Sequence, residues 1–195
     1  MRPAESPLAV SARKRDGGWV AALQVLCLLM ALANVILLYK LHAEKKSIET
    51  WRKAAELPSG VSLPALRGAD LAGQPITLPD IRNRTLLLVF STSCGFCEAN
   101  WPNWQRLIRE KPRDVDVALI NVSSTVDTGY LARHGVGGYP VMQAVDPQST
   151  LLYRLGPTPQ TILIEPGGVV HRVWSGELQP DRTNEVEAEI RGAWQ

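Results

Sequence analysis

Cysteine is scarce in this chain, which has three among its 195 residues. One of them, Cys27, lies within a long apolar segment, so Cys94 and Cys97 remain as a single pair. A single pair excludes a scaffold built from several disulfides. The sequence also lacks a second Cys-x-x-Cys and a closely spaced histidine pair, so a four-ligand zinc site is not expected. We therefore expect neither a resident metal nor an organic cofactor.

Strong net charge is also absent, since the whole chain carries a formal charge of +2. Residues 1–58 hold nine Lys and Arg against five Asp and Glu, whereas residues 59–195 hold twelve against fourteen. The basic excess therefore belongs to the first part, where it can lie against anionic lipid headgroups. The second part has no excess of positive charge, and nucleic acid is not an expected partner.

Residues 19–39 form the longest apolar run, with 21 residues and no charged side chain. As a helix this run is about 30 Å long, which matches the hydrocarbon core of a bilayer. A signal peptide is the alternative, but its apolar region of ~7–15 residues would end at a small-residue cleavage site. Here the run is longer and leads into Lys40. We therefore predict an uncleaved single-pass anchor at residues 18–40.

The remaining chain divides into three parts around this anchor. Residues 1–17 are polar and resemble a short tail, and residues 41–58 form a charged stalk that ends at Pro58. Residues 59–195 have the size of one domain. The charges on the two sides of the anchor are nearly balanced, but the cluster Arg13-Lys14-Arg15 favours a cytoplasmic N-terminus. This orientation places the domain outside the cytoplasm.

Within the domain, the hydrophobic pattern predicts strand–helix–strand followed by strand–strand–helix. Strands are expected at residues 76–78, 85–90, 115–122, 141–145, 161–165 and 169–174, and helices at 94–109, 127–133 and 181–193. The first of these helices contains Pro102, which should interrupt it. The first central strand, helix and strand imply a parallel pair joined by a crossover.

The sequence Cys94-Gly95-Phe96-Cys97 lies directly between the apolar run 85–90 and a predicted helix. Two cysteines separated by two residues can close a small disulfide ring. The helix dipole and the free N–H groups at a helix N-terminus stabilise the thiolate of the first cysteine. This arrangement of strand, Cys-x-x-Cys and helix predicts a redox site.

The order of elements around this motif resembles the thioredoxin fold, an α/β fold with a central mixed sheet flanked by helices. Pro102 follows Cys97 by five residues, as in the active-site helix of that fold. The segment Thr158-Pro159-Gln160-Thr161 precedes an apolar strand and resembles the segment in which a cis-proline faces the disulfide. Together with one N-terminal transmembrane helix, the chain is similar to the membrane-anchored extracytoplasmic thiol–disulfide oxidoreductases of the TlpA, ResA and CcmG group.

This resemblance implies roles for individual residues. Cys94 would be the attacking thiolate and Cys97 the resolving thiol, and the two would form the redox-active disulfide. Thr158 and Pro159, joined by a cis bond, would present a backbone edge to an extended substrate segment. Phe96 would offer an apolar surface beside the sulfur.

The resemblance also implies partners and a location. The substrates would be thiols and disulfides of exported proteins, with apocytochrome c or a metal-centre assembly protein as the leading candidates. A membrane electron donor of the thiol–disulfide relay type would renew the reduced form. The chain would lie in the inner (cytoplasmic) membrane with its C-terminal domain in the periplasm or its equivalent.

The chain departs from the family at three positions. Many relatives have an acidic residue where this chain has Asn100, thioredoxin has a buried acid where this chain has Leu88, and the residue before the first cysteine is Ser93 rather than Trp. The nearby carboxylate is Glu98, whose expected role is a favourable charge in the first helical turn. No proton acceptor for Cys97 can be identified from these residues.

A copper-binding metallochaperone with a thioredoxin fold is the alternative function. It would use Cys94, Cys97 and a distant histidine such as His171, because soft thiolates suit Cu(I). Such chaperones generally use a Cys-x-x-x-Cys motif, and the spacing here is one residue shorter. His134 and His171 are otherwise expected in a loop and on a strand surface.

Overall fold

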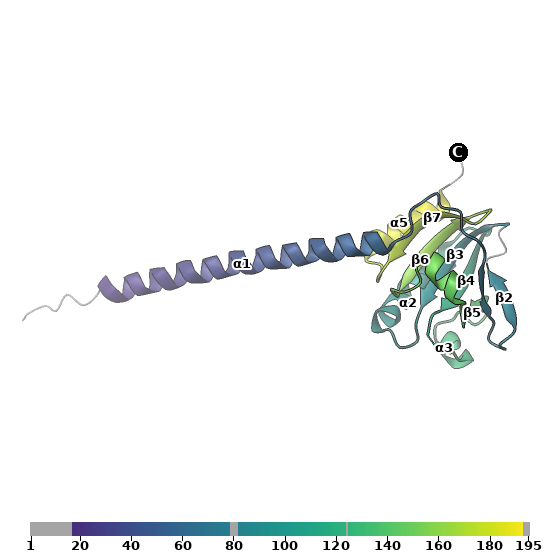
Figure 1. Ribbon diagram of the computed structural model, residues 1–195. Helices are drawn as coiled ribbons and strands as arrows, with labels where there is room; N and C mark the ends of the chain where they lie inside the picture. Colours follow the sequence, from purple (N-terminus) through teal and green to yellow (C-terminus); the bar gives the residue numbers. More distant parts are fainter. Residues whose placement is uncertain (1–16, 79–81, 124, 193–195) are drawn as a thin grey trace, which may run out of the picture. The chain divides into compact units, whose positions relative to one another are not determined.

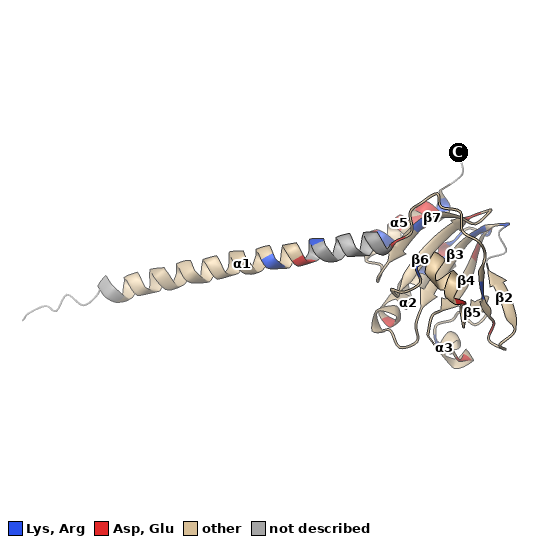
Figure 2. Ribbon diagram, in the orientation of Figure 1, with Lys and Arg blue, Asp and Glu red and all other residues tan. Residues whose placement is uncertain are grey.

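The chain forms two units, Met1–Glu49 and Thr50–Gln195, and the computed structural model describes residues 17–78, 82–123 and 125–192. Helix α1 (Gly17–Ala55) has 39 residues and provides the fold of the first unit. Its segment Trp19–Glu44 is long and apolar enough to cross a membrane, and the side chains of this segment are not buried. Figure 2 shows the uncharged first part of this helix. The helix is compatible with a single-pass membrane anchor.

The second unit is built on a five-stranded mixed sheet with the order β5-β4-β3-β6-β7 (Figure 1). Its strands are β3 (Arg84–Phe90), β4 (Val115–Asn121), β5 (Val141–Met142), β6 (Gln160–Glu165) and β7 (Val169–Ser175). Strands β3, β4 and β5 are parallel, and β6 and β7 are antiparallel to their neighbours. This is the thioredoxin-like fold that the sequence predicts. The ends of β3 and β4 and the start of β6 lie at the same edge of the sheet.

Strand β3 is the centre of this sheet, and all seven of its residues are buried. Because side chains alternate along a strand, Leu86 and Leu88 lie on one face and Leu87 and Val89 on the other. Each set belongs to a separate core cluster. One cluster includes residues from helices α2 (Gly95–Glu110), α3 (Thr128–Arg133) and α5 (Pro180–Arg191), and the other includes Tyr153, which follows α4 (Pro147–Leu152).

Two of the expected elements differ in the structure. Helix α2 contains Pro102 but continues without interruption from Gly95 to Glu110, so the predicted break is wrong. A proline costs a helix one hydrogen bond, and here Trp101 and Trp104, both buried, hold the helix against the sheet. Strand β5 covers only two of the five residues expected, because its pairing with β4 is limited to Leu119–Val141 and Ile120–Met142.

Two elements were not expected from the sequence. Strand β1 (Leu66–Ala69) pairs antiparallel with β2 (Pro75–Leu78) in a separate two-stranded sheet. Helix α4 starts at Pro147 and is capped by the carboxylate of Asp146, which accepts hydrogen bonds from the N–H groups of Gln148 and Ser149. An aspartate cap followed by proline at the first helical position is a helix-start signal. That signal could have predicted α4.

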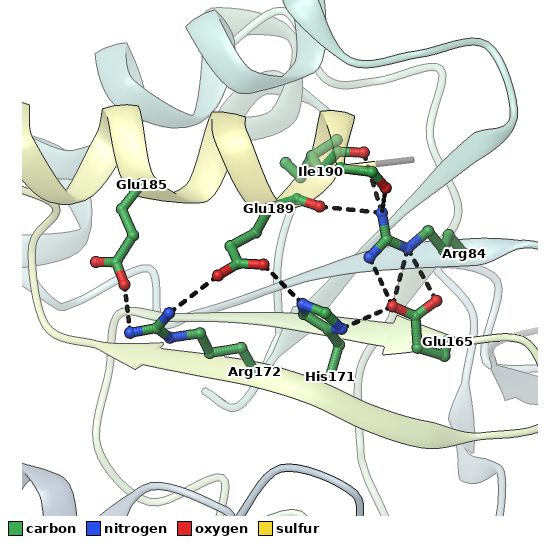
Figure 3. A network of polar contacts seen from close by, with 8 residues as sticks. Arg84, Glu165, His171, Arg172, Glu185, Glu189 and Ile190 are labelled. Carbon is green, nitrogen blue, oxygen red and sulfur yellow. Dashed lines mark hydrogen bonds and ion pairs between the residues drawn. The ribbon is translucent and has the colours of Figure 1, made fainter. Parts of the chain in front are cut away.

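A polar network lies at the sheet edge where β3 begins (Figure 3). The guanidinium of Arg84 donates to the carboxylate of Glu165 at 2.6–2.9 Å, and its Nη1 donates to the carbonyls of Glu189, Ile190 and Gly192. Because Arg84 and Glu165 are both buried, each compensates the desolvation of the other. Arg84 thereby fixes the C-terminal end of α5 to β3 and β6.

Candidate active site

Cys94 is the N-cap residue of α2. Its Sγ accepts a hydrogen bond of 3.3 Å from the backbone N–H of Cys97, and its carbonyl accepts hydrogen bonds from the N–H groups of Cys97 and Glu98. The cap therefore directs the sulfur of Cys94 toward the positive end of the helix. Cys94 is partly exposed, whereas Cys97 is fully buried, and both are free thiols in this structure.

The two thiols differ in acidity because their surroundings differ. Partial burial of Cys94 opposes ionisation, but hydrogen bonds from Cys97 and Thr158 outweigh it and hold the pKa of Cys94 below its ordinary value. Burial raises the pKa of Cys97 to about 12, and the hydrogen bond with Cys94 contributes in the same direction. The partly exposed sulfur is therefore the one that is more readily ionised.

The segment before β6 lies against the first cysteine. The Thr158–Pro159 peptide bond is cis, as the sequence predicts. The carbonyl oxygen of Thr158 is 3.6 Å from the Sγ of Cys94, within hydrogen-bonding range for a thiol. The structure thus brings the helix start with Cys94 and Cys97 together with Thr158, which is 64 residues from Cys94 in sequence. Phe96 is 69% exposed and belongs to the same helix start.

Two surface hollows lie at this edge of the sheet. One of about 320 Å³ is lined by residues that follow β4 and β5 and by Gly156. The other, of about 710 Å³, is lined mainly by α4 and extends to Gly156 and Pro157, the residue before Thr158. Ser123 in the first hollow also contacts the segment before Cys94, because its Oγ accepts from the N–H of Thr92 at 3.2 Å. The larger hollow therefore reaches the residue before Thr158, although neither cysteine lines either hollow.

The second unit combines a thiol pair at a helix start, a loop that contacts it and a mixed sheet, and the Redoxin family matches residues 58–190. The chain belongs to the Redoxin family. The thiol-disulfide oxidoreductase ResA of Oceanobacillus iheyensis is 28% identical to it over 111 residues, which are 55% of this chain and 57% of that protein. ResA of Bacillus subtilis is 29% identical over 113 residues, 56% of this chain and 63% of that protein.

The alignments thus span less than two thirds of the length of both relatives. Among solved structures, the thioredoxin domain of a thiol-disulfide oxidoreductase from Bacteroides vulgatus superposes with a TM-score of 0.53. It is 18% identical in sequence, and the superposition covers 70% of this chain and all of that one. At this identity the superposition shows the fold alone.

Glu98 in this Redoxin chain is hydrogen-bonded as well as placed in the first helical turn. Its Oε1 accepts a 2.6 Å hydrogen bond from the hydroxyl of Tyr130, which accepts one of 3.0 Å from Nε1 of Trp101. Its Oε2 lies 3.4 Å from Nε2 of His134, whose ring stacks on Trp101. Burial lowers the pKa of His134, which favours the neutral imidazole. Sequence reasoning missed Tyr130 because its partner lies 32 residues away.

Asn100 occupies the position at which many relatives have an acid, and it is fully buried. Its Oδ1 accepts hydrogen bonds from the backbone N–H of Leu178 at 2.9 Å and from Nδ2 of Asn103 at 3.2 Å. The amide therefore joins α2 to the loop that follows β7. Leu88, the other position without an acid, lies in the hydrophobic core.

His171 is not brought together with the two cysteines. Its Nδ1 lies 2.8 Å from Glu165 and its Nε2 lies 2.8 Å from Glu189, within the network at the start of β3 (Figure 3). Cys94 follows the opposite end of β3, about 20 Å away for a strand of this length. Among the described residues, no group of three or more His, Cys, Asp and Glu side chains could hold a metal ion.

Proposed function

We propose that this Redoxin chain is a membrane-tethered thiol–disulfide oxidoreductase that exchanges disulfides through Cys94 and Cys97. The main support is the difference between the two thiols: the partly exposed sulfur of Cys94 has a lowered pKa, and the buried sulfur of Cys97 a raised one. A nucleophile that is exposed and ionised, followed by a protected resolving thiol, suits two successive exchange steps. The names of the two relatives agree with this activity.

In the reducing direction, the thiolate of Cys94 attacks one sulfur of a substrate disulfide. A Cys94–substrate disulfide forms, and the other substrate sulfur leaves as a thiolate. Cys97 then loses its proton and attacks the Sγ of Cys94, so the mixed disulfide breaks and the second substrate sulfur leaves. The substrate gains two electrons and two protons, and the chain is left with a Cys94–Cys97 disulfide. A membrane dithiol donor would return the chain to its reduced form by the reverse exchange.

The surroundings of Cys94 suit a polypeptide substrate. Thr158 and Pro159 directly precede strand β6, and the backbone of this segment would pair with an extended segment of the substrate, as in strand addition. Phe96 provides an exposed apolar contact at the start of α2. Exported proteins with a disulfide are the proposed substrate class, with apocytochrome c or a metal-centre assembly protein as leading candidates. The copper-binding alternative has no such support, because His171 is engaged with two carboxylates.

An insulin-reduction assay on the reduced chain, paired with a copper titration of the same sample, tests the proposed activity. We expect turnover of insulin disulfides by the wild type, none by Cys94→Ser, and no stoichiometric Cu(I) binding that depends on His171. Tight copper binding that His171→Ala abolishes, without insulin reduction, would support the metallochaperone instead.

The proposed location needs its own experiment. A reporter fused after Gln195 that is active only outside the cytoplasm should be active in cells. Activity only of a cytoplasmic reporter would overturn both the orientation of the anchor and the choice of exported substrates.

A further inference from the structure

Glu56, the residue that follows helix α1, is hydrogen-bonded to two separate segments of the domain. Its Oε1 accepts a 2.9 Å hydrogen bond from the backbone N–H of Ser175, the last residue of β7. Its backbone carbonyl accepts a 3.0 Å hydrogen bond from Nη1 of Arg154. Glu56 therefore links the end of the stalk to β7 and to the loop between α4 and β6.

Both segments flank the loop that contacts Cys94. The carbonyl of Arg154 accepts a 3.1 Å hydrogen bond from Nε2 of Gln160, the residue after Pro159. On the other side, Gln160 and Ser175 are direct partners in the sheet, and the N–H of Gly176 donates to the carbonyl of Pro159 at 2.8 Å. The segment of Pro159 is therefore connected to Glu56 on two sides. One connection runs through Arg154 and Gln160, and the other through Ser175 and Gly176.

The carboxylate of Glu56 is held in place by charge as well. Nη2 of Arg182 lies 3.6 Å from Oε1 of Glu56, and its Nη1 donates to the carbonyl of Ser175 at 2.9 Å. The two side chains are only 18% and 16% exposed. Such a pair is screened less by water and salt than a pair on an open surface. Glu56 and Arg182 therefore bind the backbone N–H and the backbone carbonyl of Ser175, respectively.

The backbone of Arg154 has an unfavourable conformation, which its contact with Glu56 helps to maintain. Its φ of 51° lies in the left-handed region, which costs free energy for a residue other than glycine. The conformation is kept where surrounding contacts determine it. Here the side chain of Arg154 donates to Glu56 while its carbonyl accepts from Gln160. A shift of the backbone carbonyl of Glu56 would therefore allow the residues that lead into the 156–159 loop to move.

We infer that Glu56 is a positioning residue of the redox site: it holds the loop of Thr158 and Pro159 against Cys94, so the end of the stalk belongs to the active-site scaffold. The inference rests on the proposed function, and it goes beyond the role of the stalk as a spacer. Thr158 is the residue through which the effect reaches the sulfur, because its carbonyl accepts from the Sγ of Cys94 at 3.6 Å and its side chain contributes to the lowered pKa of Cys94.

The expected effect is a change in the acidity of Cys94. Hydrogen bonding by the side chain of Thr158 is one of the contributions that lower the pKa of Cys94 against the opposing effect of burial. If the loop moves away, this contribution weakens and the thiolate fraction near neutral pH falls. Each unit of rise in the pKa lowers that fraction about tenfold, so we expect a loss of about twofold to tenfold in reactivity.

The test measures alkylation of Cys94 by iodoacetamide over a pH series, in the full-length chain with Cys27→Ser. Glu56→Ala removes the side-chain acceptor and should move the midpoint of the pH profile upward. Glu56→Gln keeps an oxygen for the N–H of Ser175 and should restore most of the wild-type profile. Glu44→Ala is the matched control, because Glu44 lies in helix α1, which precedes Glu56, and its side chain is exposed.

A wild-type pH profile for Glu56→Ala would overturn the inference. If Glu56→Ala does not fold, Glu56→Asp takes its place, since it keeps the charge but withdraws the acceptor by one methylene group; a wild-type profile for this variant would be equally decisive. Alkylation does not depend on turnover of a substrate, so the outcome can be read even if the wild type fails to reduce insulin. That failure would contradict the proposed function and leave the result for Glu56 intact.

Discussion

The carbonyl oxygen of Thr158 lies 3.6 Å from the Sγ of Cys94, so a loop that precedes β6 contacts the sulfur at the start of α2. The contact lies on the exposed side of the thiol pair, since Cys97 is fully buried in the core beneath it. A partner that reaches Cys94 must therefore also meet the loop. The order in which the two thiols react follows from this geometry.

We predict that Cys94 reacts before Cys97. In a Cys27→Ser background, iodoacetamide at neutral pH should modify Cys94 alone, because Cys94 has the lowered pKa and is partly exposed. Mass spectrometry of the digested chain identifies the modified residue. Cys97→Ser should in addition accumulate mixed disulfides with substrates through Cys94. Faster modification of Cys97 would reverse the assigned roles.

The resolving step should depend on pH. Burial raises the pKa of Cys97 to about 12, so only a small fraction of this thiol is ionised near neutrality. If the thiolate limits the rate, resolution of the mixed disulfide should speed up about tenfold per pH unit below that pKa. Stopped-flow rates between about pH 6 and pH 9 measure this dependence.

A resolution rate that is fast and independent of pH would instead show that a protein group takes the proton. Glu98 is the first residue to test in that case, because it lies next to Cys97 in sequence and its carboxylate is fixed by Tyr130. Glu98→Gln would then slow the step.

The cysteine pair at the helix start and the contacting loop could be predicted from sequence because both depend on local signals. The Cys94–Cys97 spacing, the apolar run before it and the Thr158–Pro159 pair before a strand are each readable within a few residues. Their proximity followed from the resemblance to the thioredoxin fold. The supporting contacts could not be predicted in this way. The pairing of Glu56 with Ser175 joins residues 119 apart, and nothing in either neighbourhood indicates the other.

Strand β1 and helix α4 were missed for different physical reasons. Strand β1 has the sequence Leu66-Arg67-Gly68-Ala69, which has little intrinsic preference for a strand and depends on its pairing with β2. Helix α4 has only six residues, too few for a hydrophobic period to be visible. The only local signals for this helix are its N-cap, Asp146, and the proline at its first position, Pro147.

The buried pair of Arg84 and Glu165 should be important for stability and not for the redox reaction. Arg84→Met leaves the carboxylate of Glu165 buried without its main partner, and such losses cost about 3–5 kcal/mol of unfolding free energy. Urea unfolding in detergent measures the cost. Arg172→Met, in the exposed part of the same network (Figure 3), should cost less than about 1 kcal/mol. A changed pH profile of Cys94 alkylation in the folded Arg84→Met variant would contradict this prediction, because it would show that the Arg84 network affects the thiol pair.

The same network should weaken in acid. The hydrogen bond from His171 is the main contribution that holds the pKa of Glu189 below its ordinary value of 4.5. A carboxyl with a lowered pKa in the folded state stabilises the fold above its ordinary value, and this contribution is lost as the pH falls through the folded value. Unfolding free energies of the wild type should therefore fall more steeply below about pH 4.5 than those of Glu189→Gln. Equal slopes would show that Glu189 does not contribute.

Asn100 offers a direct test of how the chain works without the acid that many relatives have. An amide cannot take up a proton at neutral pH, but its Oδ1 accepts from the N–H of Leu178 and from Asn103. Asn100→Asp keeps an oxygen at that place and adds an ionisable group to a fully buried position. Burial raises the pKa of such a carboxyl, which delays its ionisation.

We therefore expect Asn100→Asp to speed the resolution of the mixed disulfide only at pH values above the raised pKa of the new carboxyl, and to match the wild type below it. Asn100→Glu should show a smaller gain, because its longer side chain must displace the loop at Leu178. Stopped-flow rates over the pH series used for the wild type measure both. A gain for Asn100→Asp that is equally large across the whole series would mean that the carboxyl ionises freely, and that burial does not govern proton transfer from Cys97.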